Sequence, residues 1–112
     1  MKVNILGSEW KIKFRKSGKD PMLDSRDGYC DRTKKILIIA KDRGDSGFAD
    51  YAAYQRSVIR HEIIHAFLIE SGLDGNWQHS EQFGHDETMV DWIAIQFPKL
   101  YKAFEVAGVL EV

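Results

Sequence analysis

The chain has 112 residues, which suits one domain with a modest core and leaves no room for two. Apolar residues make up 44% and charged residues 29% of the sequence, as in a soluble globular protein. No apolar run approaches the roughly 18 residues of a membrane span, so a membrane partner is not expected.

The net charge of −1 is divided unevenly along the chain. Residues 1–46 hold 12 Lys and Arg against 7 Asp and Glu, a net of +5, whereas residues 47–112 hold 4 against 10, a net of −6. The basic charges alternate with apolar residues and are mixed with acids, which is typical of solvated strand faces. The sequence also lacks an array of stacking aromatic residues, so nucleic-acid binding is not the expected function.

Two features bear on the cellular compartment. Cys30 is the one cysteine, so no internal disulfide can form, and Met1-Lys2-Val3-Asn4 does not open a signal peptide. Both features predict a reducing, cytoplasmic location.

The N-terminal half carries strand patterns. Val3–Leu6 is a short apolar run, and Trp10–Arg15 alternates apolar and charged residues as a half-buried strand does. Ser17–Arg26 contains turn-forming residues and is expected to be a loop. Gly28–Asp31 and Lys34–Ala40 predict a hairpin whose second strand is buried on both faces.

A long helix is expected next, over about residues 50–71. Asp50 is the predicted N-cap, and Gly72 is the predicted stop. One face of this helix is apolar and should dock on the core; its residues are Ile59, Ile63, Ala66 and Phe67.

The rest of the chain predicts a second helix from residue 85 or 86 to Phe97, which Pro98 interrupts. A short third helix is expected from Pro98 to Ala107, and the apolar tail after Gly108 is expected to dock. Strands come first and helices follow, so the predicted fold class is α+β. A small antiparallel or mixed sheet packs on the helices within one domain, residues 1–112.

The long helix contains the motif H-E-x-x-H. His61 and His65 are four residues apart, so on a helix they lie about 40° apart in azimuth, one turn above the other, where both can bind one small cation. Glu62 lies beside them and can reach a metal-activated water, as the general base of a zinc peptidase does. The alternative is three ordinary helix residues, which would be costly to bury unpaired.

A catalytic zinc ion takes three protein ligands, so the two histidines leave the site incomplete. Glu87 and Asp91 share a face of the second predicted helix. Glu87 can complete a His₂Glu ligand set, and Asp91 can accept the outer N–H of a ligand histidine. His85 competes with Glu87 as the third ligand. The alternative for both acids is that they are exposed helix residues with no ligand role.

Residues 61–65, His-Glu-Ile-Ile-His, followed by residues 87–91, Glu-Thr-Met-Val-Asp, resemble the gluzincin clan of zinc peptidases. Within that clan the chain is similar to the small ImmA/IrrE-like peptidases of phages, prophages and bacteria, and to the minimal gluzincins. The resemblance covers roughly residues 27–100. It implies a zincin-like fold, one zinc ion, a peptide or protein substrate and a location in a bacterial cytoplasm.

In the expected reaction Glu62 takes a proton from the metal-activated water as this attacks a peptide carbonyl. A strand at the sheet edge, either Ile36–Ala40 or the strand of Cys30, would pair with the substrate. The competing function is a catalytically silent, zinc-binding regulatory or interaction module. Candidate transition-state stabilisers are His79 and His85, with Tyr51, Tyr54 and Tyr101 as further possibilities. Cys30 is expected to be a buried thiol, with a latency switch on the zinc as the alternative.

Overall fold

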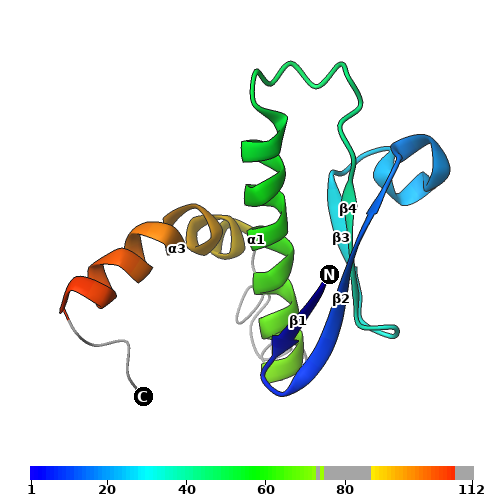
Figure 1. Cartoon of the computed structure of the whole chain (residues 1–112). Coiled ribbons are helices and arrows are strands. Elements are labelled where there is room, and N and C mark those ends of the chain that lie inside the picture. Colours follow the sequence, from blue (N-terminus) through cyan, green and yellow to red (C-terminus); the bar gives the residue numbers. More distant parts are fainter. Residues whose placement is uncertain (73, 75–86, 108–112) are drawn as a thin grey trace.

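The computed structural model describes residues 1–72, 74 and 87–107. Strands precede helices along the chain, which confirms the α+β class (Figure 1). The long elements are β1 (Lys2–Ile5), β2 (Ser8–Arg15), β3 (Gly28–Asp31), β4 (Ile36–Ala40), α1 (Tyr51–Ser71) and α3 (Glu87–Ala107). No helix among the described residues is long and apolar enough to cross a bilayer.

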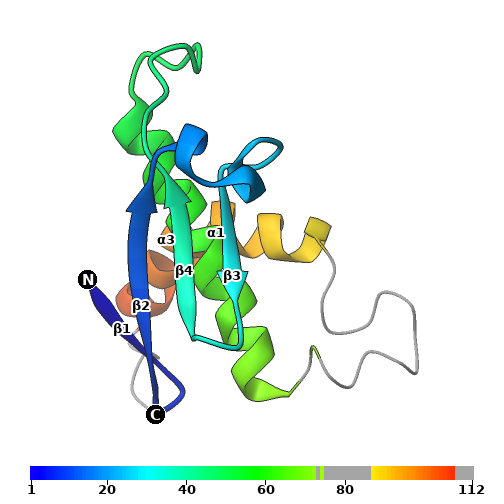
Figure 2. The same ribbon diagram turned by 90° about the vertical axis from the view of Figure 1, so that its right-hand side faces the viewer.

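The four strands form one sheet in the order β1-β2-β4-β3 (Figure 2). β2 and β4 are parallel, and the other two pairs are antiparallel. Of the two sheet types expected, the mixed one is therefore correct. β4 lies inside the sheet between β2 and β3, whereas β3 forms an edge. A substrate cannot pair with β4, so Ile36–Ala40 was the wrong candidate strand and the strand of Cys30 remains.

All five residues of β4 are buried because both faces of the sheet are covered. On one face, Leu37 and Ile39 pack with Trp10 and with Ala66 of α1. On the other face, Ile36, Ile38 and Ala40 pack with Leu23. Leu23 is the last residue of a 3₁₀ helix, η2 (Pro21–Leu23). A second 3₁₀ helix, η1 (Ser17–Lys19), precedes it, and both lie in the segment that the sequence predicted as a loop.

Polar contacts fix both ends of α1 on the sheet. The Asp50 side chain accepts a hydrogen bond from the Ala53 amide at 3.0 Å, and Gly72 ends the helix at φ 86°, so both predicted caps are confirmed. Near the start of α1, the Tyr51 hydroxyl donates to the carbonyl of Ala40 at 2.9 Å. Near its end, Trp10 Nε1 donates to Glu70 Oε1 at 2.8 Å.

The sheet-facing side of α1 is narrower than its sequence predicted. Ala66 is fully buried, and Ile59 and Ile63 pack against the same core. Phe67 does not, and it is 40% exposed. Successive helix residues differ by about 100° in azimuth, so a residue directly after Ala66 points away from the sheet.

α3 packs on α1 on the side away from the sheet, so α1 is the middle of three layers (Figure 1). The expectation of two helices separated at Pro98 is wrong, because α3 continues through it. Pro98 has no N–H for the carbonyl of Ala94, one turn earlier. Arg60 Nε of α1 donates to that carbonyl at 3.3 Å instead. A donor from another helix thus offsets the hydrogen bond that the proline removes.

We predict that Pro98→Ala raises the free energy of unfolding by about 1–3 kcal/mol, because alanine restores an N–H within a continuous helix. Urea unfolding would measure the change. Thr88→Ala, an exposed change on the same helix, should stay within about 0.5 kcal/mol of the wild type. A less stable Pro98→Ala chain would contradict a helix that runs through this residue.

Candidate metal centre

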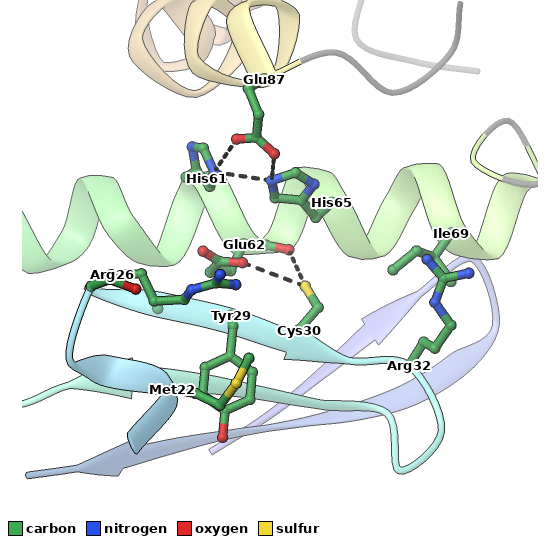
Figure 3. Close-up of a pocket in the computed structure, with 12 residues that line it drawn as sticks. Met22, Arg26, Tyr29, Cys30, Arg32, His61, Glu62, His65, Ile69 and Glu87 are labelled. Atoms are coloured by element: carbon green, nitrogen blue, oxygen red, sulfur yellow. Dashed lines mark hydrogen bonds and ion pairs between the residues drawn. The ribbon is translucent and has the colours of Figure 1, made fainter. Parts of the chain in front are cut away.

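Three of the predicted ligand residues meet where α1 faces the first turn of α3 (Figure 3). His61 Nε2 lies 3.0 Å from His65 Nε2. Glu87 spans the two rings, with Oε2 at 3.3 Å from His61 Nε2 and Oε1 at 3.2 Å from His65 Nε2. The cluster could hold a metal ion.

The spacing of these donor atoms can be compared with the edges of a tetrahedral zinc site. Zinc–nitrogen and zinc–oxygen bonds of about 2.0–2.1 Å place neighbouring ligand atoms of a tetrahedron about 3.3–3.4 Å apart. The 3.0 Å contact joins the two ring nitrogens, whereas the contacts of 3.3 and 3.2 Å reach different oxygens of Glu87. One ligand atom from each of the three residues lies within 4.8 Å of the other two, so a single small cation can bind all three once the side chains adjust.

Asp91 sets the proton position on His61. Its Oδ1 lies 2.6 Å from His61 Nδ1, the ring nitrogen that faces away from the cluster. A carboxylate at this distance favours the proton on Nδ1, which leaves a lone pair on Nε2. That lone pair faces another imidazole nitrogen and the oxygens of Glu87, an arrangement that a cation stabilises. The chemistry of the donor set therefore fits a metal.

Glu62 lies on a different side of α1 from the histidines and points toward β3 (Figure 3). It is only 6% exposed, and its Oε1 contacts the Cys30 thiol at 3.6 Å. Burial raises the pKa of the Glu62 carboxyl, while its electrostatic interaction with the His61 ring and the thiol hydrogen bond act in the opposite direction. Oε2 accepts no hydrogen bond from a described residue, and it is not a buried atom left without a partner, so it faces the solvent of the cavities. This carboxylate thus has one weak donor and one oxygen open to the cavity, as a proton acceptor for a cavity water would.

Two cavities flank Glu62. The first, of about 480 Å³, is lined by the three cluster residues, by Glu62 and by β3. The second, of about 410 Å³, lies on the Asp91 side. His61 and Glu62 line both cavities, so a substrate can be accommodated on either side of the candidate base.

Gly28 allows the edge strand to approach α1 closely beside Glu62. A Cβ atom at this position would lie 3.0 Å from Val58 Cγ1, 3.1 Å from the Ile38 carbonyl oxygen and 3.2 Å from Glu62 Cγ. These distances are shorter than ordinary van der Waals contacts, so a side chain here would displace its neighbours. The glycine therefore sets the distance between the edge strand and Glu62.

Of the candidates for stabilising the transition state, the structure describes only the three tyrosines, and none of them belongs to the cluster. His79 and His85 lie outside the described residues, so His85 also stays untested as a ligand. The Tyr51 hydroxyl is bonded to Ala40, and that of Tyr54 to Asp27, which raises the pKa of Tyr54 to about 12. Tyr101 lines neither cavity beside Glu62.

Cys30 is partly buried and is not a member of the metal cluster. Its thiol contacts the backbone oxygen of Glu62 at 3.3 Å in addition to the side chain. Burial and the negative charge of Glu62 raise the pKa of this thiol, which favours the protonated donor over the thiolate that a metal requires. This arrangement agrees with the buried-thiol interpretation and offers no support for a latency switch.

Three cavity residues had no sequence signal. Arg26 and Gly28 line both cavities, and Arg32 lines the first. All three lie in or next to the short edge strand, where an exposed arginine or a glycine is common for other reasons. Only the position of β3 beside α1 identifies them.

No protein-family model, curated protein or solved structure matches the chain.

We predict that Asp91→Ala weakens zinc affinity by about 10- to 100-fold, because His61 loses the group that orients its ring and tautomer. Competition with a chromophoric chelator would measure the dissociation constant. Asp45→Ala, a change on the exposed loop before α1, is the matched control and should leave the affinity unchanged. Equal affinities for the two variants would remove Asp91 from the metal centre.

Proposed function

We propose that the chain is a zinc-dependent peptidase of the gluzincin type, with a zincin-like fold. The main support is the convergence of His61, His65 and Glu87 in one cluster that could hold a metal ion, beside the buried carboxylate of Glu62. When bound, zinc supplies a Lewis acid that lowers the pKa of water and polarises a peptide carbonyl.

Glu62 is the proposed general base. The Cys30 thiol holds its Oε1, and its Oε2 is available to accept a proton from the attacking water. The same carboxyl then delivers that proton to the leaving amine. Its burial beside the cavities keeps the proton acceptor close to the reacting groups and limits competition from bulk water.

β3 is the proposed substrate-binding strand. It is a sheet edge, and Gly28, Tyr29 and Cys30 line the first cavity. An extended peptide can hydrogen-bond to such an edge as an additional strand, which brings its backbone past Glu62. Gly28 holds this edge close to the candidate base.

The competing proposal is a zinc-binding regulatory or interaction module without catalytic activity. The position of Glu62 favours the enzyme. A structural metal site needs no general base, and desolvation of a largely buried carboxylate lowers stability unless the group has a function. A bacterial or phage origin and a cytoplasmic location remain part of the proposal, on the resemblance of the motifs alone.

We predict about one zinc per purified chain, lost in Glu87→Ala and retained in His85→Ala. Two histidines alone bind zinc weakly, so removing the third ligand should empty the site. Elemental analysis after dialysis against dilute zinc would give the stoichiometry. A wild-type chain that takes up no zinc would overturn the proposed function, and loss of zinc in His85→Ala alone would transfer the ligand role to His85.

We predict that Glu62→Gln keeps the zinc but lowers peptide hydrolysis at least 100-fold, because glutamine cannot accept the proton. A fluorogenic peptide library would measure the rate, and zinc content would serve as the control for folding. Full activity in Glu62→Gln would exclude this residue as the base. A zinc-loaded wild-type chain that cleaves no peptide would favour the regulatory module.

A further inference from the structure

Arg26 lies at the entrance to β3 and lines both cavities that flank Glu62. Figure 3 shows its side chain extending along β3, with the guanidinium directed below Glu62. A group in this position is adjacent to any peptide that lies along the edge strand. Its side chain is exposed, so it can reach a ligand without movement of the core.

The guanidinium of Arg26 forms no hydrogen bond or ion pair with the described part of the chain. The neighbouring charges are already compensated. Asp27, the next residue, binds Arg43 at 3.1 Å and also accepts from the Tyr54 hydroxyl. Arg32, the second arginine of the first cavity, binds Asp74 at 2.7 Å. Of the two arginines in the first cavity, Arg26 is therefore the one whose guanidinium N–H groups form no hydrogen bond within the described part of the chain.

The remaining charges of the first cavity also favour an anion. Glu87 belongs to the metal cluster, and a divalent cation there more than offsets its charge. Glu62 is the one other acid among the lining residues, and it interacts with Arg26 electrostatically without a direct ion pair. With a divalent metal ion bound, the ion, Arg26 and Arg32 outweigh Glu62 and Glu87, so the lining as a whole is positive.

We propose that Arg26 forms an anion subsite that binds a carboxylate of the substrate next to the scissile bond. The planar guanidinium matches a carboxylate with two parallel hydrogen bonds. This proposal rests on the proposed peptidase function. The subsite favours peptides that carry a carboxylate at the position facing Arg26. The carboxylate comes either from an Asp or Glu side chain or from the peptide C-terminus, and the two sources share the same chemistry.

The test uses the full-length, zinc-loaded Glu62→Gln chain, so that binding is measured without turnover. Fluorescein-labelled hexapeptides are compared in pairs that differ only by Asp against Asn at one position, and in a second series by a free C-terminus against an amide. Fluorescence anisotropy gives each dissociation constant. We expect the acidic member to bind about tenfold more tightly in one series, which identifies the source of the carboxylate.

Adding Arg26→Ala should reduce this preference to less than twofold. Arg32→Ala removes one positive charge from the same cavity and should retain the preference, because Arg32 is already paired with Asp74. Equal loss in the two variants, or equal or absent binding of both members of every pair, would overturn the proposal. Cleavage by the wild-type chain without an acidic preference would leave the peptidase proposal intact and remove only the subsite.

Discussion

The structure depends on one constraint: two imidazole nitrogens, one helical turn apart, must both face a carboxylate from another helix. The contacts of 3.3 and 3.2 Å between the two rings and Glu87 of α3 leave little tolerance for rotation or sliding of α1 against α3. Bonds at both ends hold it over the sheet, from Tyr51 to the end of β4 and from Trp10 to Glu70. As the middle layer, α1 buries apolar residues toward the sheet and presents its donors on another side.

The edge strand is the second partner of this helix. β4 is buried on both faces, so it provides a rigid support on which the short β3 is paired. Gly28 brings β3 against α1 beside Glu62, and Cys30 provides the thiol contact to the same carboxylate. The candidate base is therefore positioned by α1 and β3, whereas the metal cluster is built from α1 and α3. This separation lets the base and the metal face one cavity from different directions.

Local patterns predicted most of the secondary structure. The apolar run of β4, the Asp50 cap and the Gly72 stop depend on neighbouring residues, and all three are confirmed. Non-local effects explain the failures. The donor that compensates for Pro98 comes from Arg60, 34 positions away, so sequence rules alone predict a break. The parallel pairing of β2 with β4 likewise joins segments distant in sequence.

The candidate site divides in the same way. The spacing of His61 and His65 is a property of one helix, so their proximity could be inferred directly. The proximity of Glu87 could only be proposed, because it depends on how α3 docks, and which histidine faces Asp91 was not decidable at all. Arg26 gave no signal, since an exposed arginine before a short strand is unremarkable until the strand is located.

The position of Glu87 at the first turn of α3 has a thermodynamic consequence. A metal ion held by His61, His65 and Glu87 is also a cross-link between two helices that pack on each other. Free metal at 100 times its dissociation constant would add about 2.7 kcal/mol to the folded state. Under the proposed assignment, the supply of zinc in the surroundings regulates how firmly the last helix is attached, and scarcity would loosen this helix before the sheet.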